Sequence, residues 1–105
     1  MNRKSLISAI AATTLMLGAG NALALDGGAL YKTKTCFSCH GQDAKTPILP
    51  AYPKLAGQNA AYAAQQMRDI KSGKRANGMS AAMKGVMHLV SDAEIDAIAE
   101  WLATQ

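Results

Sequence analysis

Cysteine and histidine are scarce in this chain of 105 residues, which has two of each. The cysteines are Cys36 and Cys39, and the histidines are His40 and His88. A structural zinc site usually takes about four Cys or His ligands. Such a site would therefore need all of these side chains, or a carboxylate in place of one, and the sequence does not favour it.

The chain also lacks the alternation of apolar and polar residues that predicts β-strands. A thioredoxin-like redox motif combines C-x-x-C with a βαβ unit. Because the sequence shows no strand pattern, it does not favour such a motif. A plain disulfide between Cys36 and Cys39 stays open as an alternative if the protein is exported.

A large excess of charge is absent as well. From Leu25 onward, nine Lys and Arg residues oppose seven Asp and Glu residues, which leaves a net charge of +2. Nucleic-acid binding depends on a strong basic surface, so it has no support in this sequence.

The first residues resemble a secretory signal peptide. Arg3 and Lys4 give a basic start, an apolar stretch follows from Leu6 to Leu17, and Ala22-Leu23-Ala24 has the small-x-small pattern of a cleavage site. We predict a cleaved signal peptide of residues 1–24 and one small domain of residues 25–105.

An uncleaved membrane anchor is the alternative, because no charge occurs from Ser5 to Leu25. Gly18, Gly20 and Asn21 dilute the apolar character of that stretch. We therefore expect no stable membrane insertion after cleavage.

The segment Cys36-Phe37-Ser38-Cys39-His40 has the C-x-x-C-H pattern by which haem is attached in c-type cytochromes. On a helical turn, positions i, i+3 and i+4 share one face, so Cys36, Cys39 and His40 can address one flat ligand. We predict one covalently bound haem c, with thioether bonds from both cysteines and His40 as an axial iron ligand.

Three further segments have helical signals. Residues 26–32 form a short candidate helix, Asn59 can cap a helix of residues 60–72 that stops at Gly73, and Ser91 with Glu94 forms a capping box. The last helix places apolar residues at i, i+3, i+4 and i+7, namely Ile95, Ile98, Ala99 and Leu102. The pattern predicts an all-α domain.

Pro47, Pro50 and Pro53 exclude a long helix between residues 42 and 57 and predict an extended loop. An iron-ligating histidine usually donates its other ring N–H to a neighbouring acceptor, often a backbone carbonyl. Pro53 is the predicted acceptor for His40, with Pro50 as the next choice.

The sequence offers several groups for the second axial position. Met79, Met83 and Met87 recur every four residues, which also suits simple packing along a helix, and His88 follows them. From the residues alone, a thioether, His88 and an open position all remain possible.

The ordered set of motifs resembles the class I c-type cytochromes, especially short single-haem proteins and the domains of small dihaem carriers. The residues that carry the resemblance are Gly27 with Leu30-Tyr31, Cys36 to Gly41, Tyr52 to Gln58 with Tyr62, Gly73 to Asn77, and Ser91-Asp92.

The resemblance implies a class I cytochrome c fold of about four short helices around one haem. It also implies an axial methionine about seven residues before the apolar residue that precedes the Ser-Asp cap. Val90 is that residue, so Met83 is selected, with Met79 second and Met87 third.

A protein of this kind is expected to be a soluble periplasmic carrier that moves one electron between redox proteins and has no enzymatic activity. It would need the cytochrome c maturation machinery. The alternatives are a haem-bearing subunit of one dehydrogenase, reductase or oxidase complex, and a ligand sensor with an open iron position.

Overall fold

The computed structural model describes residues 24–105, so the predicted signal peptide lies almost wholly outside the described residues. Within this range the chain forms five helices and no strand. The helices are α2 (Gly27–Thr33), α3 (Phe37–His40), α4 (Ala60–Ser72), α5 (Ser80–Met87) and α6 (Asp92–Ala103).

The all-helical prediction is confirmed, and the described chain has one helix more than the expected number of about four. α3 has only four residues and is too short to show an apolar period in the sequence. No helix within residues 24–105 is long and apolar enough to cross a bilayer.

The helix ends follow the predicted caps. The Asn59 side chain accepts a hydrogen bond from the Tyr62 backbone N–H at 3.0 Å, and α4 ends at Gly73 in the left-handed conformation, with φ of 88°. Ser91 and Glu94 bond to each other's backbone N–H groups in a complete capping box at the start of α6. These local signals set the bounds of α4 and α6.

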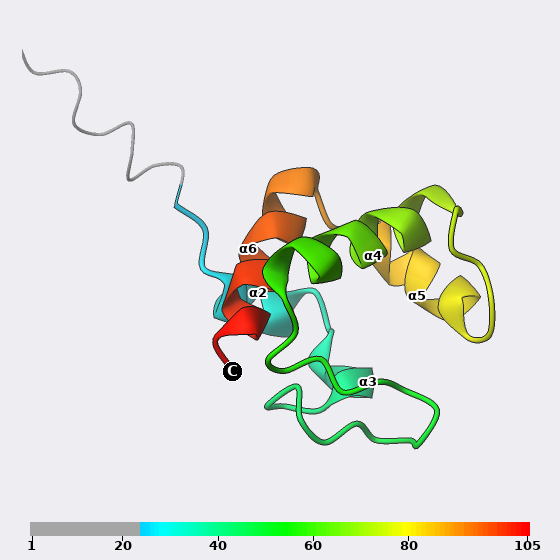
Figure 1. Ribbon diagram of the computed structural model, residues 1–105, viewed down its shortest axis with the longest axis horizontal. Coiled ribbons are helices and arrows are strands. Elements are labelled where there is room, and N and C mark those ends of the chain that lie inside the picture. The colour runs from blue at the N-terminus through cyan, green and yellow to red at the C-terminus, as the bar shows by residue number, and fades with distance from the viewer. Residues whose placement is uncertain (1–23) are drawn as a thin grey trace, which may run out of the picture.

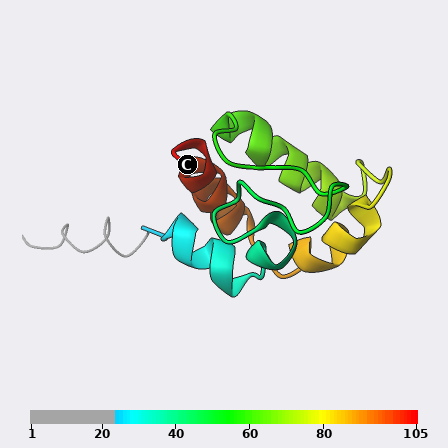
Figure 2. The same cartoon turned by 90° about the horizontal axis from the view of Figure 1, so that it is seen from below.

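α6 is the central packing element, since it contacts both α2 and α4, while α5 packs against α4 (Figure 1). α3 and the long loop of residues 41–59 lie together on one side of the domain, as the views in Figures 1 and 2 show. The chain therefore brings its first and last described helices into direct contact.

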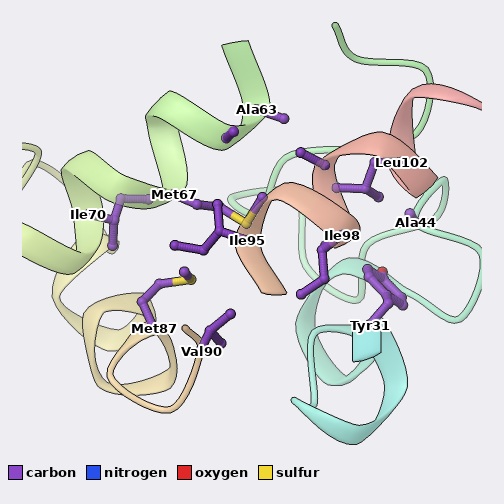
Figure 3. Close-up of a cluster of buried hydrophobic side chains, with 12 residues drawn as sticks. Tyr31, Ala44, Ala63, Met67, Ile70, Met87, Val90, Ile95, Ile98 and Leu102 are labelled. Atoms are coloured by element: carbon purple, nitrogen blue, oxygen red, sulfur yellow. The ribbon is translucent and has the colours of Figure 1, made fainter. Parts of the chain in front are cut away.

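The core is made by the predicted apolar face of α6 and by buried residues of α2, α4, α5 and the connecting loops. Its largest fully buried side chains are Tyr31, Val90, Ile95, Ile98 and Leu102. Figure 3 shows them with two buried methionines, Met67 and Met87, in one cluster between α2, α4, α5 and α6.

The contact between α2 and α6 depends on Gly27. A Cβ atom at this position would overlap the Ala97 carbonyl oxygen and would lie 2.7 Å from the Trp101 Cβ atom. Next to this crossing, the Tyr31 and Trp101 rings pack with their centroids 5.0 Å apart. The missing side chain of Gly27 lets the two helix backbones approach closely.

Gly27→Ala should therefore reduce the free energy of unfolding by about 1–3 kcal/mol, because the helices must separate to admit the methyl group. Gly85→Ala is the matched control. Gly85 lies inside α5, and no atom outside its own turn of helix lies within 4 Å of the position that a methyl group would take, so alanine there should be neutral or stabilising by up to about 1 kcal/mol. Thermal unfolding of the haem-containing proteins measures both, and equal effects at the two positions would contradict this account.

Candidate cofactor site

A cavity of about 340 Å³ lies between α3 and the bundle. Small-molecule sites in proteins usually have volumes of this order, with mostly apolar walls. All five helices and the loop after α3 contribute to its walls. The apolar and sulfur-containing side chains among the lining residues are Cys36, Cys39, Ala51, Pro53, Leu55, Ala63, Met67, Met79, Ala82, Met83, Val86, Met87, Val90, Ile98 and Leu102.

The C-x-x-C-H segment forms one wall. Cys36 is the N-cap of α3, and the backbone N–H of His40 donates to the Cys36 carbonyl oxygen at 3.0 Å, which closes one helical turn. The predicted turn therefore brings Cys36, Cys39 and His40 to the same cavity. Gly41 follows with φ of 91°, and the chain leaves the turn there.

Both thiols are free and partly buried, so no disulfide joins Cys36 to Cys39 in this structure. Burial raises the pKa of the Cys36 thiol to about 11, and the neighbouring Cys39 adds to the rise, while a backbone hydrogen bond opposes it. The Cys36 thiol is therefore protonated at neutral pH.

His40 is held by the proline-rich loop. Its Nδ1 atom lies 2.8 Å from the Pro53 carbonyl oxygen, and only 7% of the residue is exposed. Burial lowers the pKa of His40, and the hydrogen bond to Pro53 partly opposes that shift. Because a carbonyl can only accept, Nδ1 carries the proton, which leaves the Nε2 lone pair free to bind a metal.

Tyr31 supports the same segment from α2. Its hydroxyl donates to the Gly41 carbonyl oxygen at 2.5 Å, and its ring also lines the cavity. Burial is the main cause that raises the pKa of Tyr31 to about 12, so the hydroxyl keeps its proton at neutral pH. The hydrogen bond ties the end of α3 to the α2–α6 crossing.

Tyr31→Phe should lower the free energy of unfolding by about 1 kcal/mol, because one buried hydrogen bond is lost. The Gly41 carbonyl still accepts the Ala44 N–H at 3.2 Å, so the acceptor is not left without a partner. Tyr62→Phe is the control, since Tyr62 is exposed and its loss should change little. A similar loss in both variants of the haem-containing protein would exclude the Tyr31 hydrogen bond as the cause.

The three methionines of the predicted stripe all line the cavity, as does Met67 of α4. They differ in their surroundings: Met79 is 50% exposed, Met83 is half-buried, and Met87 is 2% exposed within the apolar core. Figure 3 shows Met87 beside Met67 and Val90. Met83 thus borders both the cavity and the core, without being packed fully into the core.

Two of the alternatives lie away from the cavity. His88 is exposed at the C-terminal cap of α5 and does not line the cavity. Pro50 is exposed and lines a separate shallow groove of the loop. The structure thus brings together Cys36, Cys39, His40, Pro53 and the methionines, but not His88 or Pro50.

Several polar residues of the cavity wall were not predicted as site residues, and two of them form a hydrogen-bonded pair. Gln66 of α4 and Arg75 of the following loop both line the cavity, and an Arg75 Nη atom donates to the Gln66 side-chain oxygen at 3.0 Å. Nothing in the local sequence predicts this pair, because its partners belong to different structural elements. The available signals were that Gln66 directly precedes Met67 of the buried helix face and that Arg75 lies in the segment Gly73 to Asn77, which carries part of the resemblance.

The walls fit a haem group better than a bare metal ion. The cavity offers two free thiols, a neutral imidazole and thioethers within a mostly apolar lining, which are the groups that bind a c-type haem. Among residues 24–105, no cluster of three or more Cys, His, Asp or Glu side chains could hold a metal ion by itself.

Comparison with known proteins agrees with this site. Residues 24–105 match the family described as Cytochrome c. The chain belongs to the cytochrome c family. This cytochrome c has the class I fold, and its cofactor is covalently bound haem c.

The relatives of this cytochrome c include larger proteins. It is 41% identical over 101 residues to cytochrome c4 of Pseudomonas aeruginosa, a match that covers 96% of this chain and 46% of that protein. It is 36% identical over 83 residues to a thiosulfate dehydrogenase electron acceptor of Stutzerimonas stutzeri, which covers 79% of this chain and 37% of the other.

A solved structure supports the same assignment. The reduced recombinant cytochrome c4 from Pseudomonas stutzeri superposes with a TM-score of 0.67 at 33% identity, covering 79% of this chain and 48% of that one. This cytochrome c therefore spans about half the length or less of these relatives.

Proposed function

We propose that this chain is a periplasmic, single-haem electron carrier with no enzymatic activity of its own. In this proposal the haem is bonded to Cys36 and Cys39, and its iron is bound by His40 and Met83. The observation that carries the proposal is the joint placement of these four side chains on one apolar cavity.

The bound haem would supply a one-electron change between ferric and ferrous iron. The protein residues fix its surroundings: Pro53 holds the His40 ring through Nδ1, which leaves Nε2 free to bind the iron. The mostly apolar walls formed by α4, α5 and α6 would limit the access of water to the bound haem. With His40 of α3 and Met83 of α5 as its ligands, the iron would have no open position for a substrate.

The setting is inferred from the sequence. We propose that residues 1–24 are removed on export, that the cytochrome c maturation machinery attaches the haem outside the cytoplasm, and that the mature domain is not inserted in a membrane. Its partners are then a donor and an acceptor redox protein, with no role for nucleic acid, since the mature chain has a net charge of only +2.

The direct experiment is mass spectrometry of the exported protein together with a redox titration. We expect a polypeptide that begins at Leu25, one covalently added haem mass, and a reversible one-electron couple. A colourless polypeptide with no added mass would reject the proposal. A haem protein that binds carbon monoxide rapidly in its ferrous state would instead indicate an open iron position and a ligand sensor.

A second function is favoured by one relative, which is named an electron acceptor of thiosulfate dehydrogenase. This chain would then be the haem-bearing partner of one specific dehydrogenase, reductase or oxidase. The two functions differ in assembly: a fixed complex should keep a stoichiometric catalytic subunit through purification at high salt, whereas a free carrier should be isolated alone.

A further inference from the structure

The helix that carries Met83 has few supports of its own. α5 has only eight residues, begins without a side-chain cap and packs mainly against α4. A helix of this length is marginal on its own in water. Its C-terminal end leads through residues 88–91 into α6. This short connection is therefore the second place where α5 is attached to the bundle.

Two carbonyl groups of the connection each accept a hydrogen bond from a lysine. The Lys34 ammonium donates to the Leu89 carbonyl oxygen at 2.8 Å, and the Lys71 ammonium donates to the Val90 carbonyl oxygen. Within residues 24–105, no backbone N–H donates to either carbonyl. The lysines are therefore the donors that the described chain provides for these two groups.

The two lysines come from different helices. Lys34 is the C-cap of α2, and Lys71 lies in the last turn of α4. A cation is favoured at the C-terminal end of a helix, where the helix dipole is negative. Both residues are half-buried. The ends of α2 and α4 are thus joined to adjacent residues of the same connection.

Side-chain packing holds only one end of this connection. Leu89 is 67% exposed, whereas Val90 is 1% exposed and lies in the core beside Met87 (Figure 3). Because Val90 is almost fully buried, water has little access to its carbonyl. A buried carbonyl that loses its donor is costly, so the Lys71 hydrogen bond matters more than the one from Lys34.

Lys71 also has the simpler surroundings of the two. The Lys34 ammonium lies 3.5 Å from the Glu94 carboxylate as well. The other ion pairs in the part of the chain that the structure describes belong to Arg68. A change at Lys71 therefore removes the hydrogen bond to the connection without breaking an ion pair.

We propose that Lys71, assisted by Lys34, is a positioning residue for the axial methionine. It fixes the connection after α5, and through it the helix that presents Met83 to the iron. Val90, whose carbonyl Lys71 binds, itself lines the cavity, so a shift of the connection would also move the cavity wall. This inference rests on the proposed function, because it takes Met83 as the iron ligand.

The experiment measures how fast imidazole binds to the ferric, haem-containing mature protein. Imidazole can bind only after Met83 has left the iron, so the rate at saturating imidazole reports that opening. Lys71→Met keeps the length of the side chain without its charge. The rate should rise about tenfold or more in this variant, because a hydrogen bond from a charged donor to a buried carbonyl is lost.

Three variants serve as comparisons. Lys74→Met removes the same charge from an exposed residue that does not line the cavity, and it should leave the rate unchanged. Lys71→Arg keeps the charge and the N–H donors, so it should keep most of the slow rate. Lys34→Met should give a smaller rise than Lys71→Met, and it tests the same connection if Lys71→Met does not mature.

Gly27→Ala separates positioning from general stability. It should destabilise the domain at the crossing of α2 with α6 without touching residues 88–91, so the imidazole rate should stay nearly unchanged. The thermal midpoints of Gly27→Ala and Lys71→Met are measured alongside the rates. A fast rate in Lys71→Met alone then reports the position of α5 and not the overall stability.

Two results would overturn the assignment of Lys71: a rate in Lys71→Met equal to that of Lys74→Met, or an equally fast rate in Gly27→Ala. Either result leaves the proposed function intact, provided that the unmodified protein carries haem and shows the sulfur-to-iron charge-transfer band. Absence of haem or of that band would instead reject the proposed function, and the role of Lys71 with it.

Discussion

Replacing Cys36 and Cys39 together by alanine should yield an exported polypeptide without covalently attached haem and without a cooperative thermal transition. The structure has a cavity of about 340 Å³ between its helices. At about 24 cal/mol per Å³ of cavity, leaving it empty corresponds to at most about 8 kcal/mol. A domain of about this size rarely has more than about 3–5 kcal/mol of stability from its core alone. The polypeptide should therefore not stay folded.

The measurements are the mass of the secreted protein and its far-ultraviolet circular dichroism during heating. Ser38→Ala is the control, because Ser38 lies between the cysteines but is exposed, and this variant should keep both haem and fold. A haem-free double variant that still melts cooperatively would show that the helices do not need a group in the cavity.

The helices with strong end signals were predictable from the sequence, and those without were not. Asn59, Gly73 and the Ser91–Glu94 box mark their helix ends by local hydrogen bonds and backbone conformation, so the bounds of α4 and α6 follow from a few residues. α5 was only suggested by the spacing of its methionines. It begins at Ser80 with no side-chain cap. The sequence therefore contains no capping residue that would predict where this helix begins.

The site was predictable to the extent that its residues are close in sequence. C-x-x-C-H places its three groups on one turn, whereas contacts such as Gln66 with Arg75 or Tyr31 with Gly41 depend on how separate elements pack. The same limit applies to the methionines. Four of them, Met67, Met79, Met83 and Met87, line the cavity, and it is the resemblance to class I cytochromes that selects Met83.

Replacing Met83 by alanine should abolish the sulfur-to-iron charge-transfer band of the ferric protein and open the iron to carbon monoxide in the ferrous protein. The reduction potential should fall strongly, because a thioether favours ferrous iron relative to the water or nitrogen ligand that replaces it. Absorption spectra of both oxidation states and a redox titration measure these changes.

Met79→Ala and Met87→Leu are the matched controls. Met79 is 50% exposed, so its loss should not disturb the core, while leucine at the buried Met87 keeps most of the packing. Both variants should keep the band. If the band is lost in Met79→Ala and kept in Met83→Ala, the axial ligand is Met79 and the assignment by resemblance is wrong.

The crossing of α2 with α6 also has a consequence for the order of events as the polypeptide folds. These helices are separated by most of the described chain, yet they pack directly on each other at Gly27 and Trp101. Closing so long a loop is slow and entropically costly, and a polypeptide still emerging without α6 lacks the partner for α2. The segment of residues 36–40 should therefore be accessible to a maturation enzyme while α6 is not yet packed against α2.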